Sequence, residues 1–530
     1  MRRRTALKAG AITCAVALLG SLAACGGSKE PTTTADGKPI VSVLVVKRPA
    51  TDKIANMQWA KDLEADCDCK IEWQEVSEDA WAQQKNATLA AGKIADVSLH
   101  AFFPANAAQF PGLFEDLSKD LDKMPNVKQF FKEKPDAQKL TTDPEGHMYA
   151  LPSSRGKSYS GTGQHMFINK TWLDKLGLQV PTTWDELENV LKAFKTQDPN
   201  GNGQADEIPM NIQKLGSGFS WYSPMLLLNS TGIPTGFNKG VSTSGYYVKN
   251  GVVKSFLTSD EYKEVVKYYH KLISEGLIPA DWATKTFDAC DTDQLSDGKT
   301  AKTGVSFGWS QDASFGTLKD QYIPIPVPSA PGVSPDKTVW DGSSSEFDAA
   351  GPAVSARAAN KDATLKLLNL MYSEKYSVQQ FYGSFGKTVT KTGEHEYTVD
   401  NDKLIEMRKK NTSPSLSYPA GWIPDEVTIK GDAGSDALYQ ASKVYEKQRS
   451  NFDPVKDYIP DYVNPDADDN TTLASNYNQI SNVAMQKTAT WMSKGGIDEE
   501  WDAYCKQLDS LGLQENVKIW QKWYDIYTKK

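Results

Sequence analysis

Residues 40–46, Ile-Val-Ser-Val-Leu-Val-Val, form a β-branched apolar run that is typical of a buried strand. An alternating segment follows at 70–76 (Lys-Ile-Glu-Trp-Gln-Glu-Val), and a short apolar one at 95–100 (Ala-Asp-Val-Ser-Leu-His), with helical patterns between them. A β-α-β-α succession predicts a mostly parallel sheet that is covered by helices. The first part of the chain is therefore predicted to be an α/β domain.

Polar residues stand where two of these predicted strands end. Lys47 and Arg48 come directly after the first strand, and His100 ends the third. Open α/β sheets bind ligands at the carboxyl ends of their strands. These three side chains are therefore candidate ligand contacts, and a solvated surface role is the alternative for each.

A second α/β unit follows the first. Thr183 with Glu186, and Thr258 with Glu261, form two capping boxes, and each precedes an amphipathic helical pattern. Residues 452–472 are polar and rich in proline, which predicts a long surface loop. No short internal repeat is found in the sequence.

Composition excludes some classes of protein. The chain has 530 residues, 39% of them hydrophobic, and its 59 basic against 67 acidic side chains give a formal net charge of −8. This hydrophobic content is enough to form a core, so a disordered chain is excluded. Because basic residues do not cluster beyond the N-terminus, no nucleic-acid partner is predicted. The length allows three or four domains, or a two-lobed body.

The N-terminus is typical of an exported lipoprotein. Basic residues within 2–8 precede an uncharged run over 9–24, which is too short for a comfortable membrane span. Cys25 closes a Leu-Ala-Ala-Cys sequence that resembles a bacterial lipobox. We therefore predict a signal peptide over 1–24, and a lipidated Cys25 with a polar tether over 25–38. An uncleaved membrane anchor is the alternative, and an arginine pair leaves both general and twin-arginine export open.

Four cysteines remain beyond the predicted lipidation site, namely Cys67, Cys69, Cys290 and Cys505. An even number permits disulfides in an exported protein, but three pairings are possible and the sequence does not choose between them. Metal binding by Cys67 and Cys69 is the alternative, although no second cysteine pair or nearby histidine supports it.

Several motifs of common enzyme families are absent from the sequence. It contains no GxxxxGK[ST] phosphate loop, no GxGxxG and no HExxH. The protein is therefore predicted not to be an enzyme. Catalytic carboxylate pairs meet in space rather than in sequence, so a secreted lipoprotein enzyme acting on glycans stays as the alternative.

Residues 198–207 match the front of an EF-hand calcium loop. Oxygen-bearing side chains occupy its first, third, fifth and ninth positions, and a glycine occupies the sixth. Pro209 stands where the bidentate glutamate is usual, so Glu207 would have to supply that carboxylate. We predict one structural Ca²⁺, and a simple polar turn is the alternative. The predicted ligands are Asp198, Asn200, Asn202, the Gln204 carbonyl, Asp206 and Glu207.

Several short motifs together resemble the extracellular solute-binding proteins of carbohydrate ABC transporters. The calcium-like loop is similar to that of the alginate-binding and related oligosaccharide-binding branch. The resemblance covers nearly the whole chain beyond the signal peptide. Its motifs are Asp143–Gly146 with Tyr149–Pro152, Phe167–Gly177, Pro181–Glu186, Ser274–Leu277, Trp501–Tyr504 and Leu511–Asp525.

This resemblance implies a two-lobed α/β fold of the type II periplasmic-binding-protein kind, with a ligand cleft between the lobes. Three crossovers would connect the lobes, the first near 150–155 and the second near 347–352. The expected N-terminal lobe is 39–152 plus 350–385, and the expected C-terminal lobe is 153–349 plus 386–530.

The function implied is that of a monomeric, lipid-anchored receptor at the outer face of the bacterial cell membrane. It would bind an oligosaccharide and deliver it to the permease subunits of an ABC transporter. An adhesion protein is a further alternative.

Sugar sites combine flat aromatic platforms with a few polar groups. The resemblance implies that Trp309 and Trp221 stack on sugar, with Trp422 as a weaker third platform. Tryptophans on amphipathic helical patterns are predicted to be core residues instead, namely Trp172, Trp184, Trp501, Trp520 and Trp523. The complete predicted set of sugar contacts is Lys47, Arg48, His100, Arg155, Trp221, Trp309, Trp340, Asp341, Glu346 and Trp422.

Overall fold

The computed structural model describes residues 31–104, 106, 110, 112–216, 219, 221–237, 245–410, 412–416 and 419–529. The predicted signal peptide and Cys25 lie outside these residues. Within them, none of the helices combines the length and the apolar character that a membrane crossing requires.

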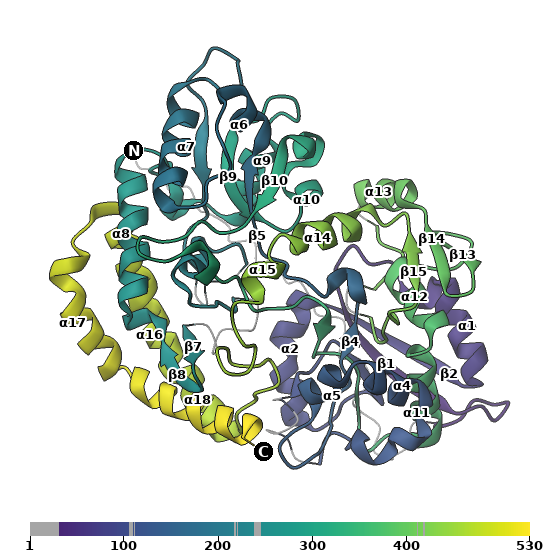
Figure 1. Ribbon diagram of the computed structural model, residues 1–530. Coiled ribbons are helices and arrows are strands. Elements are labelled where there is room, and N and C mark those ends of the chain that lie inside the picture. The colour runs from purple at the N-terminus through teal and green to yellow at the C-terminus, as the bar shows by residue number, and fades with distance from the viewer. Residues whose placement is uncertain are drawn as a thin grey trace, which may run out of the picture.

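The N-terminal lobe is built on a sheet of order β12-β3-β1-β2 (Figure 1). β1 runs parallel to β2 and β3, as the β-α-β-α pattern predicts, and β12 pairs antiparallel with β3. Val41, Val43 and Val45 of β1 are buried in the lobe core. The strands are β1 (Ile40–Lys47), β2 (Lys70–Ser77), β3 (Val97–Leu99) and β12 (Ala353–Val354), and the helices are α1 (Gln58–Cys67), α2 (Glu78–Ala91), α4 (Pro125–Glu133), α5 (Pro135–Thr141), α11 (Lys361–Met371) and α12 (Glu374–Tyr382).

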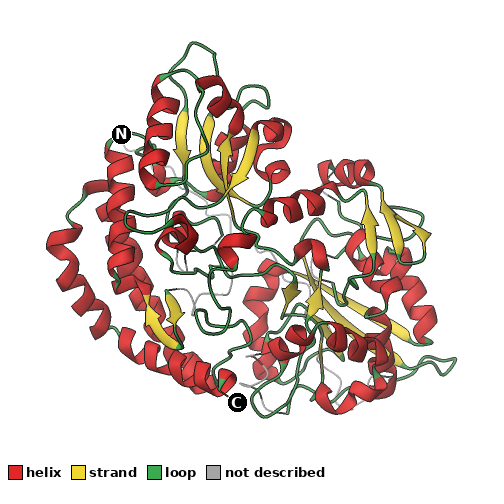
Figure 2. Cartoon of the chain, in the orientation of Figure 1, coloured by secondary structure: helices red, strands yellow, loops and turns green. Residues whose placement is uncertain are grey.

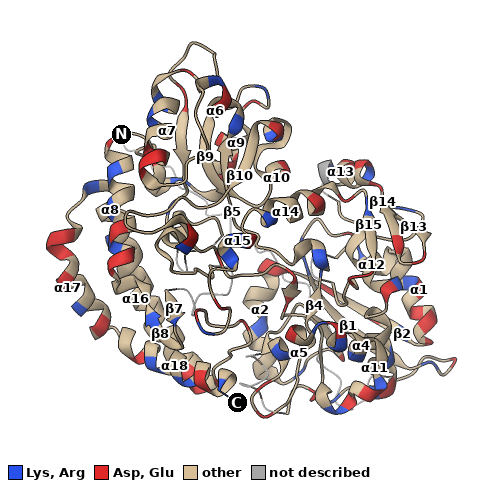
Figure 3. Ribbon diagram, viewed as in Figure 1, with Lys and Arg blue, Asp and Glu red and all other residues tan. Residues whose placement is uncertain are grey.

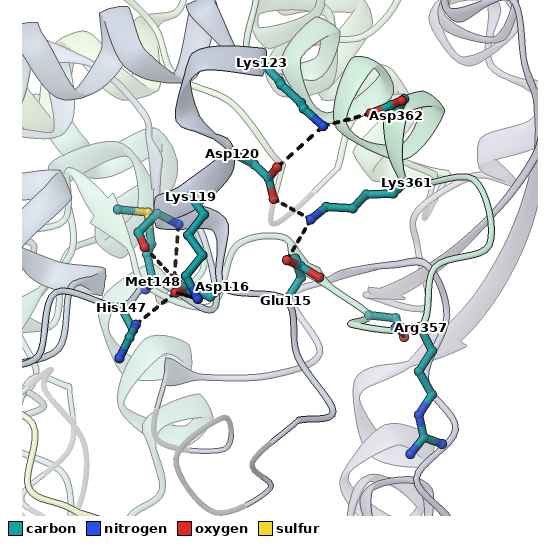
Figure 4. A network of polar contacts seen from close by, with 12 residues as sticks. Glu115, Asp116, Lys119, Asp120, Lys123, His147, Met148, Arg357, Lys361 and Asp362 are labelled. Atoms are coloured by element: carbon teal, nitrogen blue, oxygen red, sulfur yellow. Dashed lines mark hydrogen bonds and ion pairs between the residues drawn. The ribbon is translucent and has the colours of Figure 1, made fainter.

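Ion pairs join two segments of this lobe that are far apart in the sequence (Figure 4). Lys361 of α11 contacts Glu115 and Asp120, at 2.8 and 2.9 Å. Asp120 lies in the short helix η2 (Leu117–Lys123), and Lys123 reaches back to Asp362 at 3.0 Å. The network therefore fixes α11 against η2.

The C-terminal lobe has its own sheet, of order β10-β5-β9-β6. β5 is antiparallel to β10 and β9, and β6 is parallel to β9. The strands are β5 (His165–Asn169), β6 (Ile208–Asn211), β9 (Thr303–Gly308) and β10 (Tyr322–Ile325), with a separate hairpin of β7 (Tyr246–Lys249) and β8 (Val252–Ser255). The helices around the sheet are α6 (Lys170–Leu176), α7 (Trp184–Thr196), α8 (Asp260–Ser274), α9 (Phe287–Leu295) and α10 (Gln311–Phe315).

The last two helices of the chain, α17 (Ile497–Ser510) and α18 (Leu513–Thr528), form an outer arc on this lobe, drawn in yellow in Figure 1 and seen as helices in Figure 2. α16 (Ala467–Lys494) lies inside this arc and packs along α8. The predicted core tryptophans are buried in this lobe, at exposures of 8% or less: Trp172, Trp184, Trp501, Trp520 and Trp523.

The two predicted capping boxes have different outcomes. Thr183 caps α7 as predicted, because its hydroxyl accepts a hydrogen bond from the Glu186 amide. The cap of α8 is Ser259 rather than Thr258, and it accepts from the Tyr262 amide. Thr258 and Ser259 both precede α8 and both carry a hydroxyl group, so the local sequence pattern alone could not decide which of them caps the helix.

The described residues within 386–430 pack on the N-terminal lobe, so their expected place in the C-terminal lobe is wrong. The small sheet β13-β14-β15 shares a hydrophobic cluster with Val378 of α12. Leu416, Ala420 and Trp422 belong to the core that contains β1. The chain returns to the C-terminal lobe with Tyr445. The elements of this part are β13 (Val389–Gly393), β14 (Glu396–Val399), α13 (Asn401–Lys409), β15 (Thr428–Lys430), α14 (Ala433–Lys443) and α15 (Glu446–Arg449).

The crossovers between the lobes meet at one residue, Ser154. β4 (Ser153–Ser154) pairs antiparallel with β11 (Phe347–Asp348), at the two places where the first crossovers are expected. The third crossover lies at 421–423, because the Ser154 amide donates to the Gly421 carbonyl at 3.0 Å and the Ile423 amide donates to the Ser154 carbonyl at 3.1 Å. Adjacent connecting strands of this kind can act as a hinge.

Two segments expected to be irregular are partly ordered. The tether folds back from residue 32, where the Asn360 side-chain amide donates to the Thr32 carbonyl at 2.6 Å. α16 begins at Ala467, within the expected surface loop 452–472, so the loop is shorter than expected. Tyr458 in this loop is only 7% exposed. The polar, proline-rich composition of this segment does not indicate that Tyr458 is buried, because its burial depends on the rest of the lobe.

Cys67 and Cys69 form a disulfide, while Cys290 and Cys505 are free thiols. Asp68 between the two bonded cysteines adopts a left-handed conformation with φ of 54°. The disulfide uses both sulfurs, so the alternative of a metal site at these cysteines is wrong.

Candidate functional site

A cavity of about 1650 Å³ lies between the two lobes and reaches the crossovers. It is larger than the roughly 300–1,000 Å³ of a site for a drug-sized ligand. The N-terminal lobe contributes Arg48, Lys85, His100, Phe103, Asn106, Asp136 and Lys139 to its lining. The C-terminal lobe contributes Gln213, Trp221, Tyr222, Phe287, Trp309, Arg449 and Tyr458, and the crossovers contribute Arg155, Glu346 and Asp348.

Four aromatic rings follow one another along the side of the cavity that the C-terminal lobe forms. We call these rings the aromatic wall. They are Trp309, Trp221, Tyr222 and Phe287. Trp309 follows β9, and Phe287 begins α9. The ring centroids are 5.6 Å apart for Trp309 and Trp221, 5.8 Å for Trp221 and Tyr222, and 5.4 Å for Tyr222 and Phe287. The structure thus places Trp221 and Trp309 in the cleft, and their contact with sugar stays a prediction.

The backbone of Gly163 supports the inner end of this wall. A Cβ atom there would lie 2.4 Å from Cζ3 of Trp309 and 2.8 Å from Cζ3 of Trp221. The Tyr222 amide, at a residue with φ of 57°, donates to the Gln164 side-chain oxygen at 2.8 Å. A left-handed tyrosine is uncommon and needs such support. Segment 163–164 therefore positions the three inner rings.

Four of the predicted polar residues line the cavity, namely Arg48, His100, Arg155 and Glu346. His100 Nδ1 lies 3.3 Å from Oδ2 of Asp348. Burial of Asp348 favours the neutral acid, but the hydrogen bond and charge of His100, the Ala350 amide and the charge of Arg155 together outweigh it, so the pKa of Asp348 lies below its ordinary value.

The Glu346 carboxylate is already engaged in an ion pair. Lys134 Nζ lies 2.8 Å from Glu346 and 2.7 Å from Asp425, so one ammonium joins the second crossover to the segment after the third. The Ser154 hydroxyl also approaches Glu346, at 3.4 Å. Glu346 thus has a clear structural role in holding the crossovers together, beside its place in the cavity lining.

Lys47 is not part of the cavity lining, which corrects the prediction for it. Its ammonium pairs with Glu75 of the neighbouring strand at 2.6 Å and donates to the Thr51 carbonyl at 2.8 Å. The side chain of this last residue of β1 is therefore held between β2 and the following turn.

The predictions for Trp340, Asp341 and Trp422 are also wrong. Trp340 is fully buried and stacks on Tyr445, with centroids 4.3 Å apart. Asp341 is fully buried and accepts from the Thr235 hydroxyl at 2.7 Å. Trp422 is 3% exposed and donates its indole N–H to the Tyr372 carbonyl at 3.1 Å. Core packing uses all three side chains, so they offer no surface to a ligand.

Sequence reasoning missed Tyr222, Phe287, Phe103 and Asp348. Tyr222 adjoins the predicted Trp221, and this adjacency was a usable signal. Phe287 begins a helix directly after its cap, Thr286, where a side chain that points toward the helix start has no preceding turn to pack on. Phe103 and Asp348 carry no local signal, because their position depends on the meeting of the two lobes.

The calcium-like loop lies between α7 and β6, away from the cavity. Asp198 Oδ1 accepts from the Gly201 amide at 2.9 Å, and Asn202 Oδ1 accepts from the Gln204 amide at 2.7 Å. Asp206 contacts Asn202 at 3.0 Å and pairs with Lys302 at 2.9 Å. The polar side chains therefore gather on the inside of one tight turn, as the spacing predicts.

One carboxylate oxygen in this loop has no hydrogen-bond partner. Glu207 Oε1 is buried without a hydrogen bond, although an ionised carboxylate in this position needs one. Burial, and then the charges of Asp198 and Asp206, raise the pKa of Glu207. Oxygen ligands and excess negative charge are the chemistry that Ca²⁺ prefers, so the donor set fits this ion.

The sequence profile of the family described as "Bacterial extracellular solute-binding protein" matches residues 51–378, which is more than half of the chain. The chain belongs to this family. The two lobes and the cleft between them are thus those of a bacterial extracellular solute-binding protein.

This solute-binding protein is similar to several named proteins and solved structures. A solved structure named "HMO binding ABC-transporter associated Solute Binding Protein", from Bifidobacterium longum infantis ATCC 15697, is 86% identical, with a TM-score of 0.92 over 93% of this chain and 100% of its own. The fructooligosaccharide ABC transporter substrate-binding protein FusA of Streptococcus pneumoniae serotype 4 is 27% identical, over 96% of each chain. A solved structure of an EF-hand mutant of FusA with fructo-nystose has a TM-score of 0.76 at 25% identity, over 92% of this chain and 99% of its own.

A likeness of fold alone extends to the alginate-binding protein AlgQ2. Its calcium-free structure is 21% identical and has a TM-score of 0.67, over 94% of this solute-binding protein and 100% of its own chain. The predicted resemblance to carbohydrate-binding members of the family is confirmed by these relatives.

Proposed function

We propose that this solute-binding protein captures an oligosaccharide outside the cell and delivers it to the permease of an ABC transporter. The observation that carries the proposal is the aromatic wall in a large cavity between two lobes. Aromatic faces stack on the C–H faces of sugar rings, and polar side chains at the rim bind their hydroxyl groups. The highly identical HMO-binding relative makes HMO the first ligand to test.

The charges in the cavity favour a neutral sugar over a polyanion. Basic Arg48, Lys85 and Arg155 line it together with acidic Asp136 and Asp348. The two signs are also interspersed over the rest of both lobes (Figure 3). A polyanion needs an excess of positive potential along its whole length.

The loop 198–207 is proposed to hold one Ca²⁺. The unpaired Glu207 oxygen and the inward-facing Asp198, Asn202 and Asp206 support this assignment. The name of the FusA relative refers to an EF-hand, which agrees with a calcium loop in this branch. The ion would fix a turn of the C-terminal lobe and would have no chemical role.

Cys25 is proposed to carry a lipid that holds a monomeric receptor at the outer face of the cell membrane. The Leu-Ala-Ala-Cys sequence supports this, together with membership of an extracellular family. No catalytic role is proposed, since the relatives are named as binding proteins. Intact recovery of a labelled oligosaccharide after incubation would separate a receptor from the alternative of a glycan-cleaving enzyme.

The proposal is tested by binding to purified protein in the presence of Ca²⁺. A thermal-shift screen would use HMO preparations, kestose, nystose and monosaccharides. A ligand at 100 times its Kd adds about 2.7 kcal/mol to the free energy of unfolding, so binding is easily detected. A protein that responds to none of the oligosaccharides would contradict the proposal.

Trp309→Ala then tests the site itself. Loss of one stacking platform is expected to weaken binding roughly 5- to 150-fold, while the melting temperature changes little. Trp73→Ala is the matched control, because Trp73 is also half-buried but packs on Trp59 in the other lobe. Unchanged affinity for Trp309→Ala, with a lower melting temperature, would make Trp309 a core residue.

A further inference from the structure

The outer end of the aromatic wall is unusually exposed for a phenylalanine. Phe287 retains 42% of its accessible surface, although it lines the cavity beside Tyr222. Trp309 and Trp221, at the inner end, are half-buried. Leaving a phenyl ring in water loses the free energy that its burial would contribute. An exposed ring inside a binding cleft therefore points to a ligand that covers it.

Contact between neighbouring rings makes this outer position continuous with the inner one. Phe287 stacks on Tyr222 at an interplanar angle of 29°, and Tyr222 packs in turn on Trp221. Stacking covers one face of Phe287 and leaves the rest of the ring to the cavity. The wall is thus one apolar track that runs from Trp309 outward to Phe287.

A second exposed ring lines the same cavity from the other lobe. Phe103 is 50% exposed, and its ring packs edge-on against His100, with centroids 6.5 Å apart. The N-terminal lobe thus also presents an apolar ring to the cavity. A chain lying along the track could contact rings from both lobes.

The size of the cavity agrees with an extended ligand. Its volume of about 1650 Å³ exceeds what a short sugar occupies beside Trp309 and Trp221. If each ring carries one sugar unit, a ligand reaches Phe287 only when it has about four units.

Building on the proposed function, we propose that Phe287 is the outer platform of the cleft and determines its preference for chain length. Oligosaccharides of four or more units stack on Phe287, and shorter ones stop at the inner tryptophans. The protein is then a receptor for extended oligosaccharides rather than for di- or trisaccharides.

The test measures which chain lengths the protein selects from a mixture. Wild-type protein with Ca²⁺ is equilibrated with a pool of HMO and fructooligosaccharides of two to six units, and the bound sugars are recovered by ultrafiltration and sized by mass spectrometry. The wild type should enrich chains of four or more units. Phe287→Ala should bind those chains roughly 5- to 10-fold more weakly, and the loss should be confined to them.

Leu295→Ala is the matched control. Leu295 lies on the same helix, α9, and is 40% exposed, but it does not line the cavity. The Leu295→Ala variant should bind the same distribution of oligosaccharide chain lengths as the wild type. Phe287→Tyr keeps a ring at the outer position and should restore the preference for long chains, which guards against a folding defect in Phe287→Ala.

Two results would overturn the inference while leaving the proposed function intact. One is a Phe287→Ala profile equal to that of the wild type, and the other is an equal loss at every chain length. A wild type that binds no sugar in the pool would instead contradict the proposed function itself.

Discussion

At the scale of single residues, Gly163 decides where the two cleft tryptophans lie. The nearest atoms to its absent Cβ are Trp309 Cζ3, Ser345 Oγ and Trp221 Cζ3, all within 2.8 Å. Its φ is not among the positive values, so the backbone itself would accept an alanine. The requirement for glycine therefore comes from the two indole rings and not from the turn.

Gly163→Ala is expected to weaken oligosaccharide binding at least 5-fold, because the methyl group must displace one or both indoles from their packed position. Isothermal titration with the best ligand of the thermal-shift screen measures the effect. Near-ultraviolet circular dichroism of the free protein should change as well, since the two indoles are in edge-to-face contact.

Gly304→Ala serves as a control for crowding at a buried glycine. Its Cβ would lie 2.5 Å from Cδ2 of Phe194 in the core of the C-terminal lobe. This variant should lose stability through strain in the core while ligand affinity is retained. If Gly163→Ala also retained full affinity and an unchanged spectrum, Gly163 would not be a positioning residue.

At the scale of elements, the calcium-like loop connects α7 to β6. Asp198 caps the turn by accepting amide hydrogen bonds, and Lys302 approaches the loop from the start of β9. The buried, unpaired oxygen of Glu207 is the feature that the turn alone does not satisfy. A cation in the loop would neutralise Glu207 and join the loop to the central sheet.

Strong chelation is therefore expected to lower the melting temperature without abolishing the fold, because the sheet core does not depend on the loop. Asp198→Ala should melt at the temperature of the chelated wild type and should no longer respond to chelator. Differential scanning calorimetry and metal analysis of untreated protein check this prediction.

Asp297→Ala is the control for the calcium experiment. Asp297 is also a turn residue of the C-terminal lobe and accepts from the Lys299 amide at 2.8 Å, but it is not part of the loop. It should keep the response to chelator. If the untreated protein contains no calcium and Asp198→Ala melts at the same temperature as the wild type, the motif is only a polar turn.

At the scale of the whole molecule, the crossovers at Ser154 allow the lobes to move as units. Each lobe has its own hydrophobic core, and the segments 153–154, 347–348 and 421–423 join them through backbone hydrogen bonds. Lys134 pairs with Glu346 and Asp425, which lie beside two of these segments. Motion concentrated at such connections closes a cleft without unfolding either core.

Ligand binding is expected to make the molecule more compact, because closure brings the N-terminal side of the cavity onto a sugar held by the aromatic wall. Small-angle scattering should show a smaller radius of gyration at saturating oligosaccharide, with unchanged far-ultraviolet circular dichroism. Trp309→Ala at the same ligand concentration should show a smaller change. An unchanged radius of gyration for a saturated wild type would contradict closure.

Much of this protein could be predicted from local sequence patterns. The strand at 40–46, the cap at Thr183 and the five core tryptophans on helices each follow from residues that are close in the chain. Periodicity and capping are short-range properties, so one segment contains the information. The placement of Trp309 and Trp221 came instead from their position within family motifs.

Tertiary structure alone decided which loop residues face the cleft. Trp340 and Trp309 both lie in irregular segments rich in serine and glycine, yet Trp340 is buried against Tyr445, which is more than 100 residues away. Trp422 likewise packs on Phe130 of the distant α4, and the sheet within 386–430 stays on the first lobe through its packing on α12. The burial of a side chain depends on contacts between residues that are far apart in the chain, and no local pattern specifies which of those contacts form.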